Sequence, residues 1–200
     1  MNKRSRIVLI TDSFLPKLNS ASIQVNDLSL ELSKKYEVTV ITPCNELKQS
    51  WSLLKNKENL YVLKLKIYRI NSRSLLARMI NEFFMPFFMI FNLRKSQHAL
   101  TKWDFLIWYS PSVFLSSFVK KIKQNSKCKC YLILRDLFPQ WTVDLGLLRK
   151  KSFSYWFLNR FTILQNNIAD IIGIQSIGNF PFMLEYGKLV SSKVEVLNNW

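Results

Sequence analysis

The chain has 200 residues, which is enough for one large domain or two small ones with a sizeable core. Its 48% hydrophobic and 14% aromatic content excludes a disordered chain and a coiled coil. Lys and Arg number 29 against 13 acidic residues, and the net charge of +16 is spread over both halves of the sequence. A uniformly basic body favours polyanionic partners, namely nucleic acid, anionic lipid or phosphorylated small molecules.

Several kinds of site are missing from the sequence. His98 is the single histidine, which excludes a His-rich zinc site. The three cysteines, Cys44, Cys128 and Cys130, are most simply free thiols in a reducing compartment. Only four glycines occur and none forms the G-x-G-x-x-G fingerprint of dinucleotide binding. We therefore expect no metal and no bound cofactor.

The sequence shows no signal peptide and no spanning helix. The apolar run behind the basic N-terminus covers only residues 7–10, and Asp12 follows closely. The longest apolar run, residues 83–91, is much shorter than the roughly 20 residues that a spanning helix needs. We expect a cytoplasmic chain.

Strand-like and helix-like segments alternate along the chain. It opens with a β-branched strand at residues 6–11, a helix at 22–35 capped by Ser20 or Ser22, and a strand at 36–42 that Pro43 ends. A loop containing Trp51 leads to an alternating strand near 61–70 and a long helical stretch at 73–101, broken or kinked at Pro86. Then come strand 104–109, helix 112–124, strand 130–134, helix 151–168, strand 170–175, helix 178–188 and strand 193–197. This alternation predicts one doubly wound α/β domain over residues 1–200, with a mostly parallel sheet and helices on both faces.

Ligands of such sheets bind at the carboxyl ends of the strands. That rule selects a set of polar and aromatic residues that should converge on one crevice: Asp12, Asn19, Ser20, Tyr109, Arg135, Asp136, Gln175 and Ser176. We expect Arg135 and Asp136 to hold a phosphate or an acceptor hydroxyl, with Asp136 as the catalytic base or orienting group. The structural alternatives are an ion pair that closes the turn and a helix cap at Asp136. Asp12 fits a capping role equally well, Gln175 and Ser176 fit a turn, and Tyr109 fits the core.

The most distinctive feature of the sequence is an aromatic stretch at residues 83–91 with basic residues on both sides. We expect it to contact an anionic membrane surface through Phe83, Phe84, Phe87, Phe88 and Phe91, with Arg78, Arg94 and Lys95 at its rim. The alternative is a core helix that crosses the sheet. Part of the stretch must be core, because apolar residues all round a helix cannot face one surface.

Four stretches in order resemble the N-terminal domain of family 4 glycosyltransferases. They are residues 7–16 (IVLITDSFLP), 28–43 (LSLELSKKYEVTVITP), 134–146 (LRDLFPQWTVDLG) and 194–200 (VEVLNNW). The last two are similar to segments of bacterial O-antigen and capsule enzymes, and the similarity covers the whole chain.

The resemblance implies one half of a GT-B fold, in which two Rossmann-like domains face each other. It implies retaining transfer of a sugar from a nucleotide-sugar donor, without an obligatory metal, to a lipid-linked sugar acceptor in surface-polysaccharide synthesis. The N-terminal half of that family mainly holds the acceptor, and the donor-binding C-terminal domain is expected to be absent from this chain. The chain departs from the family in two ways: the loop at residues 16–22 has no glycine, and His98 lies in a predicted helix, away from the strand ends.

We therefore expect the acceptor-side half of a glycosyltransferase, peripheral on the inner face of the plasma membrane. One alternative is a non-catalytic, membrane-docked subunit that recruits a separate donor-binding domain. A nucleic-acid binder is the other, and we expect no nucleic acid because no recognition helix or aromatic platform is evident.

Overall fold

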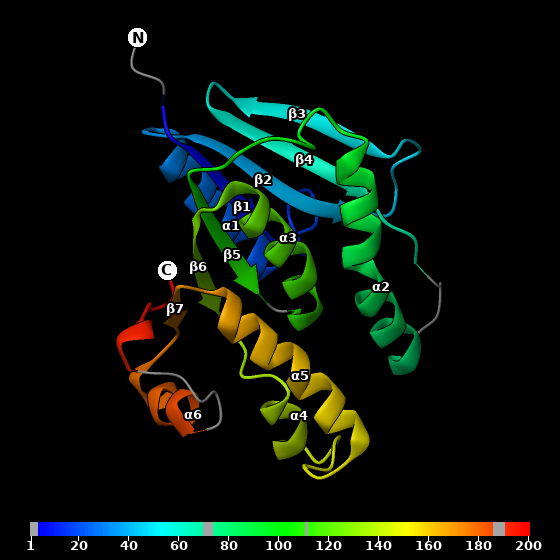
Figure 1. Cartoon of the computed structure of the whole chain (residues 1–200), viewed down its shortest axis with the longest axis vertical. Coiled ribbons are helices and arrows are strands. Elements are labelled where there is room, and N and C mark those ends of the chain that lie inside the picture. The colour runs from blue at the N-terminus through cyan, green and yellow to red at the C-terminus, as the bar shows by residue number, and fades with distance from the viewer. Residues whose placement is uncertain (1–3, 70–73, 111, 186–190) are drawn as a thin grey trace.

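A computed structural model describes residues 4–69, 74–110, 112–185 and 191–200 of the chain. Its strands are β1 (Arg6–Ile10), β2 (Glu37–Cys44), β3 (Trp51–Lys57), β4 (Leu60–Lys66), β5 (Phe105–Ser110), β6 (Lys129–Leu134), β7 (Ile171–Ile174) and β8 (Val194–Val196). Its α-helices are α1 (Ser20–Ser33), α2 (Leu75–Arg94), α3 (Ser116–Ser126), α4 (Gln140–Asp144), α5 (Phe153–Ile168) and α6 (Phe180–Glu185) (Figure 1). Short 3-10 helices precede α3, α6 and β8, at Val113–Leu115, Ile177–Asn179 and Ser191–Lys193.

The strands form one sheet in the order β3-β4-β2-β1-β5-β6-β7-β8. Every pair is parallel except β3 with β4. The prediction of a doubly wound, mostly parallel α/β sheet is therefore confirmed. β1 pairs with β2 on one side and with β5 on the other, so the strand order reverses between β1 and β5. Ligands of doubly wound sheets bind outside the carboxyl ends of the strands at such a point.

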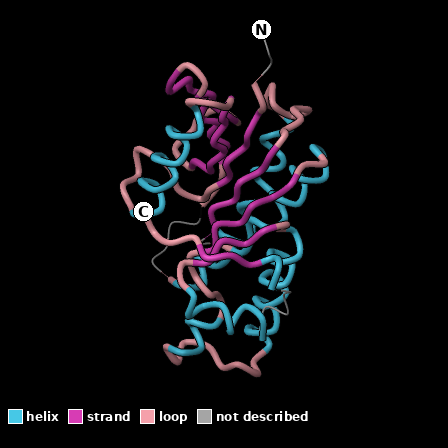
Figure 2. The backbone as a smooth tube through the Cα atoms, turned by 90° about the vertical axis from the view of Figure 1, so that its left-hand side faces the viewer, coloured by secondary structure: helices cyan, strands magenta, loops and turns pink. Residues whose placement is uncertain are grey.

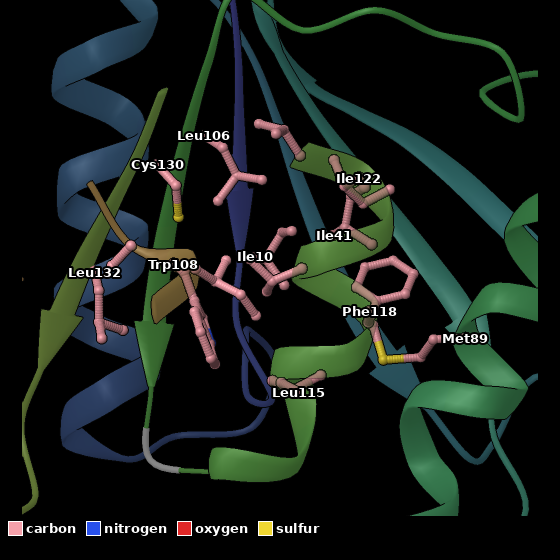
Figure 3. Close-up of a cluster of buried hydrophobic side chains, with 14 of the residues drawn as sticks. Ile10, Ile41, Met89, Leu106, Trp108, Leu115, Phe118, Ile122, Cys130 and Leu132 are labelled. Atoms are coloured by element: carbon pink, nitrogen blue, oxygen red, sulfur yellow. The ribbon is translucent and has the colours of Figure 1, made fainter. Parts of the chain in front are cut away.

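Helices pack on both faces of the sheet (Figure 2). On one face, α2 and α3 bring Met89, Phe118 and Ile122 into the same buried cluster as Ile10 and Trp108 of the sheet (Figure 3). These side chains are completely or almost completely buried. Because burial of apolar surface stabilises the folded state, this cluster is the main source of hydrophobic stabilisation.

The opposite face is covered by α1. Its inward residues Val25, Ser29 and Ser33 follow a helical spacing, and Val25 packs against Leu9 and Val40. This face positions the first turn of α1 beside the carboxyl end of β1.

Two predictions about strands are wrong. Trp51 does not lie in a loop: it opens β3, whose last four residues face solvent, so no alternating pattern marks this edge strand in the sequence. Pro43 does not end β2, which continues to Cys44. A proline is tolerated there because β1 stops pairing with β2 at Ile41, so that side of the strand needs no hydrogen-bond donor from Pro43.

The predicted helix boundaries also need correction. The long helix ends at Arg94, where the Ser96 hydroxyl donates to the Leu93 carbonyl, and it continues through Pro86 instead of breaking. The N-cap of α1 is Asn19, not Ser20 or Ser22. Residue 70 of the expected strand 61–70, residue 73 of the expected helix 73–101 and residues 186–188 of the expected helix 178–188 lie outside the described residues. Within the described ranges, no helix combines the length and the apolar character that crossing a bilayer requires.

Gly173 of β7 is a point where a side chain would crowd its neighbours. A Cβ atom there would lie 2.4 Å from the Tyr131 Oη atom and 3.0 Å from the Leu197 Cβ atom. Tyr131 cannot move freely, because its hydroxyl donates to the Glu195 carboxylate at 2.7 Å.

We expect Gly173→Ala to lower the free energy of unfolding by about 1–3 kcal/mol. Urea unfolding would measure this change. The matched control is Gly178→Ala, since a Cβ atom at Gly178 would meet only the Ser176 Oγ atom, at 3.7 Å. Equal stability of the two variants would contradict the close approach at Gly173.

Candidate functional site

A hollow of about 380 Å³, which we call the cleft, lies at the carboxyl edge of the sheet beside the first turn of α1. Its lining comes from the ends of β1, β5, β6 and β7, from α1 and from the C-terminal segment: Asp12, Ser13, Lys17, Asn19, Ser20, Ala21, Gln24, Tyr109, Arg135, Asp136, Gln175 and Asn199. All the polar residues predicted to converge at the strand ends lie here except Ser176. Ser176 is exposed and leads into the 3-10 helix before α6.

The loop between β1 and α1 is fixed by a capping box. The Asn19 side-chain oxygen accepts from the Ser22 backbone N–H at 2.8 Å, and the Asn19 N–H donates to the Ser22 hydroxyl oxygen at 3.0 Å. The Asn19 amide nitrogen also donates to the Ser13 hydroxyl oxygen at 2.9 Å. Asn19 therefore holds the loop, while Ser20 is exposed at the positive end of α1, where an anion is favoured.

Arg135 is the most unusual side chain of the cleft. It is only 8% exposed, and its Nη1 atom donates to the Leu197 carbonyl at 3.2 Å. Its Nε and Nη2 atoms are buried without a hydrogen-bond partner, and among the described residues no carboxylate pairs with it. The ion pair with Asp136 that the sequence offered as an alternative is thus not formed. A buried charge without a counter-ion is costly, so this guanidinium is suited to receive an anion from a ligand.

Aromatic and amide side chains hold Arg135 in place. The guanidinium carbon lies 4.8 Å from the centre of the Trp200 ring and 5.8 Å from that of Tyr109. The Tyr109 hydroxyl donates to the Gln24 side-chain oxygen at 2.7 Å, and the Gln24 amide donates to the Trp200 carbonyl at 3.3 Å. Burial raises the pKa of Tyr109, so it acts as a neutral hydrogen-bond donor.

Two carboxylates line the cleft. Asp12 Oδ1 is buried with no partner among the described residues. Burial, and then the nearby negative charge of Glu82, raise the pKa of Asp12 to about 6. Burial also raises the pKa of Asp136. A carboxylate that titrates near neutral pH can accept a proton from a bound hydroxyl, and Asp12 has a free oxygen for this.

Sequence reasoning did not select Gln24 and Asn199, which line the cleft, or Trp200, which packs on Arg135. Gln24 lies on α1, where its spacing marks only a polar helix face, and Trp200 follows the last strand. Sequence reasoning placed Lys17 in the segment at the end of the first strand without giving it a role, although its charge was an available signal.

The predicted membrane-contact residues separate into two groups. Phe83 packs in an aromatic cluster with Phe114 and Phe161, and Phe88 packs on the main core. These two side chains are half-buried and pack toward the protein. Phe84, Phe87 and Phe91 are 47%, 52% and 55% exposed and lie at helical spacing along α2. We call these three the aromatic stripe.

The predicted cations are exposed, and one of them contacts the aromatic stripe. Arg78, Arg94 and Lys95 are all exposed, and the Lys95 ammonium lies 4.2 Å from the centre of the Phe91 ring. Exposed aromatic side chains with cations beside them are typical of surfaces that rest on anionic lipid.

No three side chains of His, Cys, Asp or Glu gather as metal ligands within the described ranges. The absence of a metal and of a cofactor stays a prediction.

Comparison with known proteins identifies the fold. No family model matches the sequence, and no curated protein matches it. Among 45 matching chains of solved structures is a trehalose-6-phosphate structure from E. coli bound with UDP-2-fluoro glucose. It has a TM-score of 0.63 and 11% identity, over 96% of this chain and 48% of that one.

Two other solved structures match as well. Sucrose-phosphate synthase from Thermosynechococcus elongatus has a TM-score of 0.65 and 10% identity, over 98% of this chain and 90% of that one. A UDP-glucosyltransferase from Polygonum tinctorium capable of glucosylating indoxyl has a TM-score of 0.62 and 9% identity, over 100% and 52%. This chain therefore has the Rossmann-like α/β fold of GT-B glycosyltransferase domains. It spans about half the length of the first structure and of the last.

Proposed function

We propose that this chain is the acceptor-side half of a GT-B glycosyltransferase. In this proposal the enzyme transfers a sugar from a nucleotide-sugar donor to a lipid-linked glycan, in bacterial surface-polysaccharide synthesis of the family 4 type. The donor nucleotide is bound mainly by a second domain. The observation that carries the proposal is Arg135, a buried guanidinium without a counter-ion in a cleft at the switch point of the sheet.

Some residues of the cleft bind the substrates, and others transfer a proton. Arg135 and the first turn of α1 bind anionic oxygens of the substrates. Tyr109, Gln24 and Gln175 offer hydrogen bonds to sugar hydroxyls. Asp136 orients the acceptor hydroxyl or accepts its proton, and Asp12 is the second carboxylate suited to that step.

Binding measurements on the 200-residue chain test the acceptor-side assignment. We expect lipid-linked glycans extracted from the membranes of the source cells to bind the chain more tightly than a UDP-sugar does. We also expect no sugar transfer by this chain alone, because the donor site belongs to the second domain. Sugar transfer catalysed by the isolated 200 residues would contradict the assignment.

The aromatic stripe supports the choice of a lipid-linked acceptor. Its three phenylalanines lie on the solvent side of α2, the Lys95 ammonium lies against the Phe91 ring, and the chain has a net charge of +16. In this proposal the protein is peripheral on the inner face of the plasma membrane, because anionic lipid attracts the cations and the rings enter the interface.

Replacing Phe84, Phe87 and Phe91 together by Ser is expected to weaken binding to phosphatidylglycerol-containing vesicles by about a hundredfold, since each ring loses roughly 1 kcal/mol of interfacial burial. Vesicle sedimentation measures this, with phosphatidylcholine vesicles as the uncharged comparison. The matched control replaces Leu54, Leu100 and Ile177 by Ser, which are 49%, 85% and 73% exposed and lie outside α2. The same loss of vesicle binding in both triple variants would contradict a specific role of the aromatic stripe in membrane binding.

A further inference from the structure

A second hollow, of about 560 Å³, lies between the β1–α1 loop and the carboxyl ends of β2 and β4. We call it the basic hollow. Its lining is Asp12, Ser13, Phe14, Leu15, Pro16, Lys17, Thr42, Pro43, Cys44, Asn45, Glu46, Lys64, Ile67 and Arg69. Asp12, Ser13 and Lys17 line the cleft as well, so the two hollows meet at Asp12.

Three cations face the basic hollow. Lys17, Lys64 and Arg69 form no ion pair among the described residues. The carboxylates in the lining are Asp12 and Glu46, and Glu46 is exposed. The positive charges of Lys17 and Arg69 both lower the pKa of Asp12, against the larger effect of its burial, so these cations lie close to the junction with the cleft.

A buried hydroxyl adds a hydrogen-bond donor to this wall. Thr42 is 3% exposed, and its Oγ1 atom has no partner among the described residues. Thr42 lies opposite Lys64 in the register of β2 and β4. Buried polar groups are nearly always satisfied, so an unpaired hydroxyl beside free ammonium groups favours a ligand with acceptor oxygens.

The residue next to Arg69 contacts the helix that carries the aromatic stripe. Tyr68, next to Arg69, packs edge-on against Phe88 of α2, with ring centres 5.2 Å apart.

We propose that the basic hollow binds the phosphate group of the acceptor, whose sugar extends past Asp12 into the cleft. This inference rests on the proposed function, because it assigns part of that acceptor. Lys64, Arg69 and Lys17 donate to the phosphate oxygens and neutralise their charge, and the Thr42 hydroxyl donates to one of them.

Titration of the 200-residue chain with inorganic pyrophosphate tests the site without any sugar transfer. We expect the double variant Lys64→Gln/Arg69→Gln to weaken pyrophosphate binding by about a hundredfold, because two charge-assisted hydrogen bonds are lost. The control Lys55→Gln/Lys57→Gln removes the same charge at the other end of the β3–β4 hairpin, from exposed positions. We expect it to change binding less than twofold, roughly the effect of remote charges in salt.

Equal weakening by the two double variants would overturn the proposal, because it would mean non-specific attraction to a basic protein. Unchanged binding by Lys64→Gln/Arg69→Gln would overturn it too. Thr42→Val provides a second variant that keeps shape and charge, and we expect about tenfold weaker binding with the fold intact. Full binding by a folded Thr42→Val chain would count against the assigned donor and against the site.

A second arm distinguishes lipid-borne from soluble phosphate. Phosphatidylcholine vesicles that carry a polyprenyl diphosphate should bind the chain, and inorganic pyrophosphate should displace it. Binding to pyrophosphate alone assigns the same site to a soluble sugar phosphate. Both results support the basic hollow as a phosphate site, and failure of both probes to bind overturns it.

Failure of the phosphate site can be distinguished from failure of the proposed function. Arg135→Met changes the cleft and leaves the basic hollow untouched, so it should keep the Lys64-dependent pyrophosphate binding. Lys64-dependent pyrophosphate binding by the chain, together with unchanged sugar transfer in membranes of cells whose gene is disrupted, would refute the proposed function and leave the anion site standing.

Discussion

Replacing Asp12 by Asn is expected to stabilise the folded chain at pH 8 by up to about 3 kcal/mol. In membranes that contain the intact protein, we expect the same change to lower the rate of sugar transfer by about a hundredfold or more. The pKa of Asp12 is raised from 3.8 to about 6, first by burial and then by Glu82. Protonation of Asp12 therefore favours the folded state. This stabilisation is complete below about pH 4 and is lost as the pH rises through 6. At pH 8 the ionised carboxylate therefore destabilises the folded state.

Urea unfolding of the parent and of Asp12→Asn at pH 4 and pH 8 measures the effect. The two proteins should differ at pH 8 and converge toward pH 4. Asp27→Asn is the control, because Asp27 is an exposed carboxylate of α1 that should leave stability unchanged. A stability gain that does not depend on pH, or a loss at pH 8, would contradict the assigned burial of Asp12.

Replacing Arg135 by Met is expected to lower sugar transfer by more than about a hundredfold and to leave the free energy of unfolding within about 1 kcal/mol of the parent value. Arg135 is buried but has no carboxylate partner among the described residues, so its removal leaves no orphaned counter-ion. The loss of one hydrogen bond to the Leu197 carbonyl is offset by the gain of an apolar side chain beneath Trp200.

Initial rates of transfer in membranes that contain the intact protein, together with urea unfolding of the purified chain, measure both effects. Arg135→Lys keeps the charge but not the planar geometry, and we expect it to restore only part of the activity. A large loss of stability in Arg135→Met would mean that the guanidinium is structural, which would contradict the ligand-binding role.

Most of the fold could be predicted from the sequence because buried parallel strands and amphipathic helices carry clear periodic signals. The β-branched run of β1 is an example, since all but its first residue are buried. β3 could not be predicted because it packs at an edge, with Lys55 and Lys57 exposed. Pro43 led to a wrong prediction for the end of β2. A proline is tolerated at that position because β1 has already stopped pairing with β2, and the sequence does not show where the pairing stops.

The position of the site could also be predicted from the sequence, because the carboxyl ends of parallel strands share one edge of the sheet. This rule gathers Asp12, Tyr109 and Arg135 correctly. It cannot supply contacts between segments that only the folded chain brings together. The hydrogen bond from Tyr109 to Gln24 joins residues 85 positions apart, and the position of Trp200 over Arg135 depends on how the C-terminal segment crosses the sheet edge.

Sugar transfer in membranes of the source cells tests the proposed function most directly. Membranes from cells with the gene intact and from cells with the gene disrupted are incubated with radiolabelled nucleotide sugars, and label is counted in the lipid-extractable glycan. We expect one of the sugars to label the glycan in the first membranes, and we expect this label to be lost in the second. Equal labelling in both would contradict a role for this protein in glycosyl transfer.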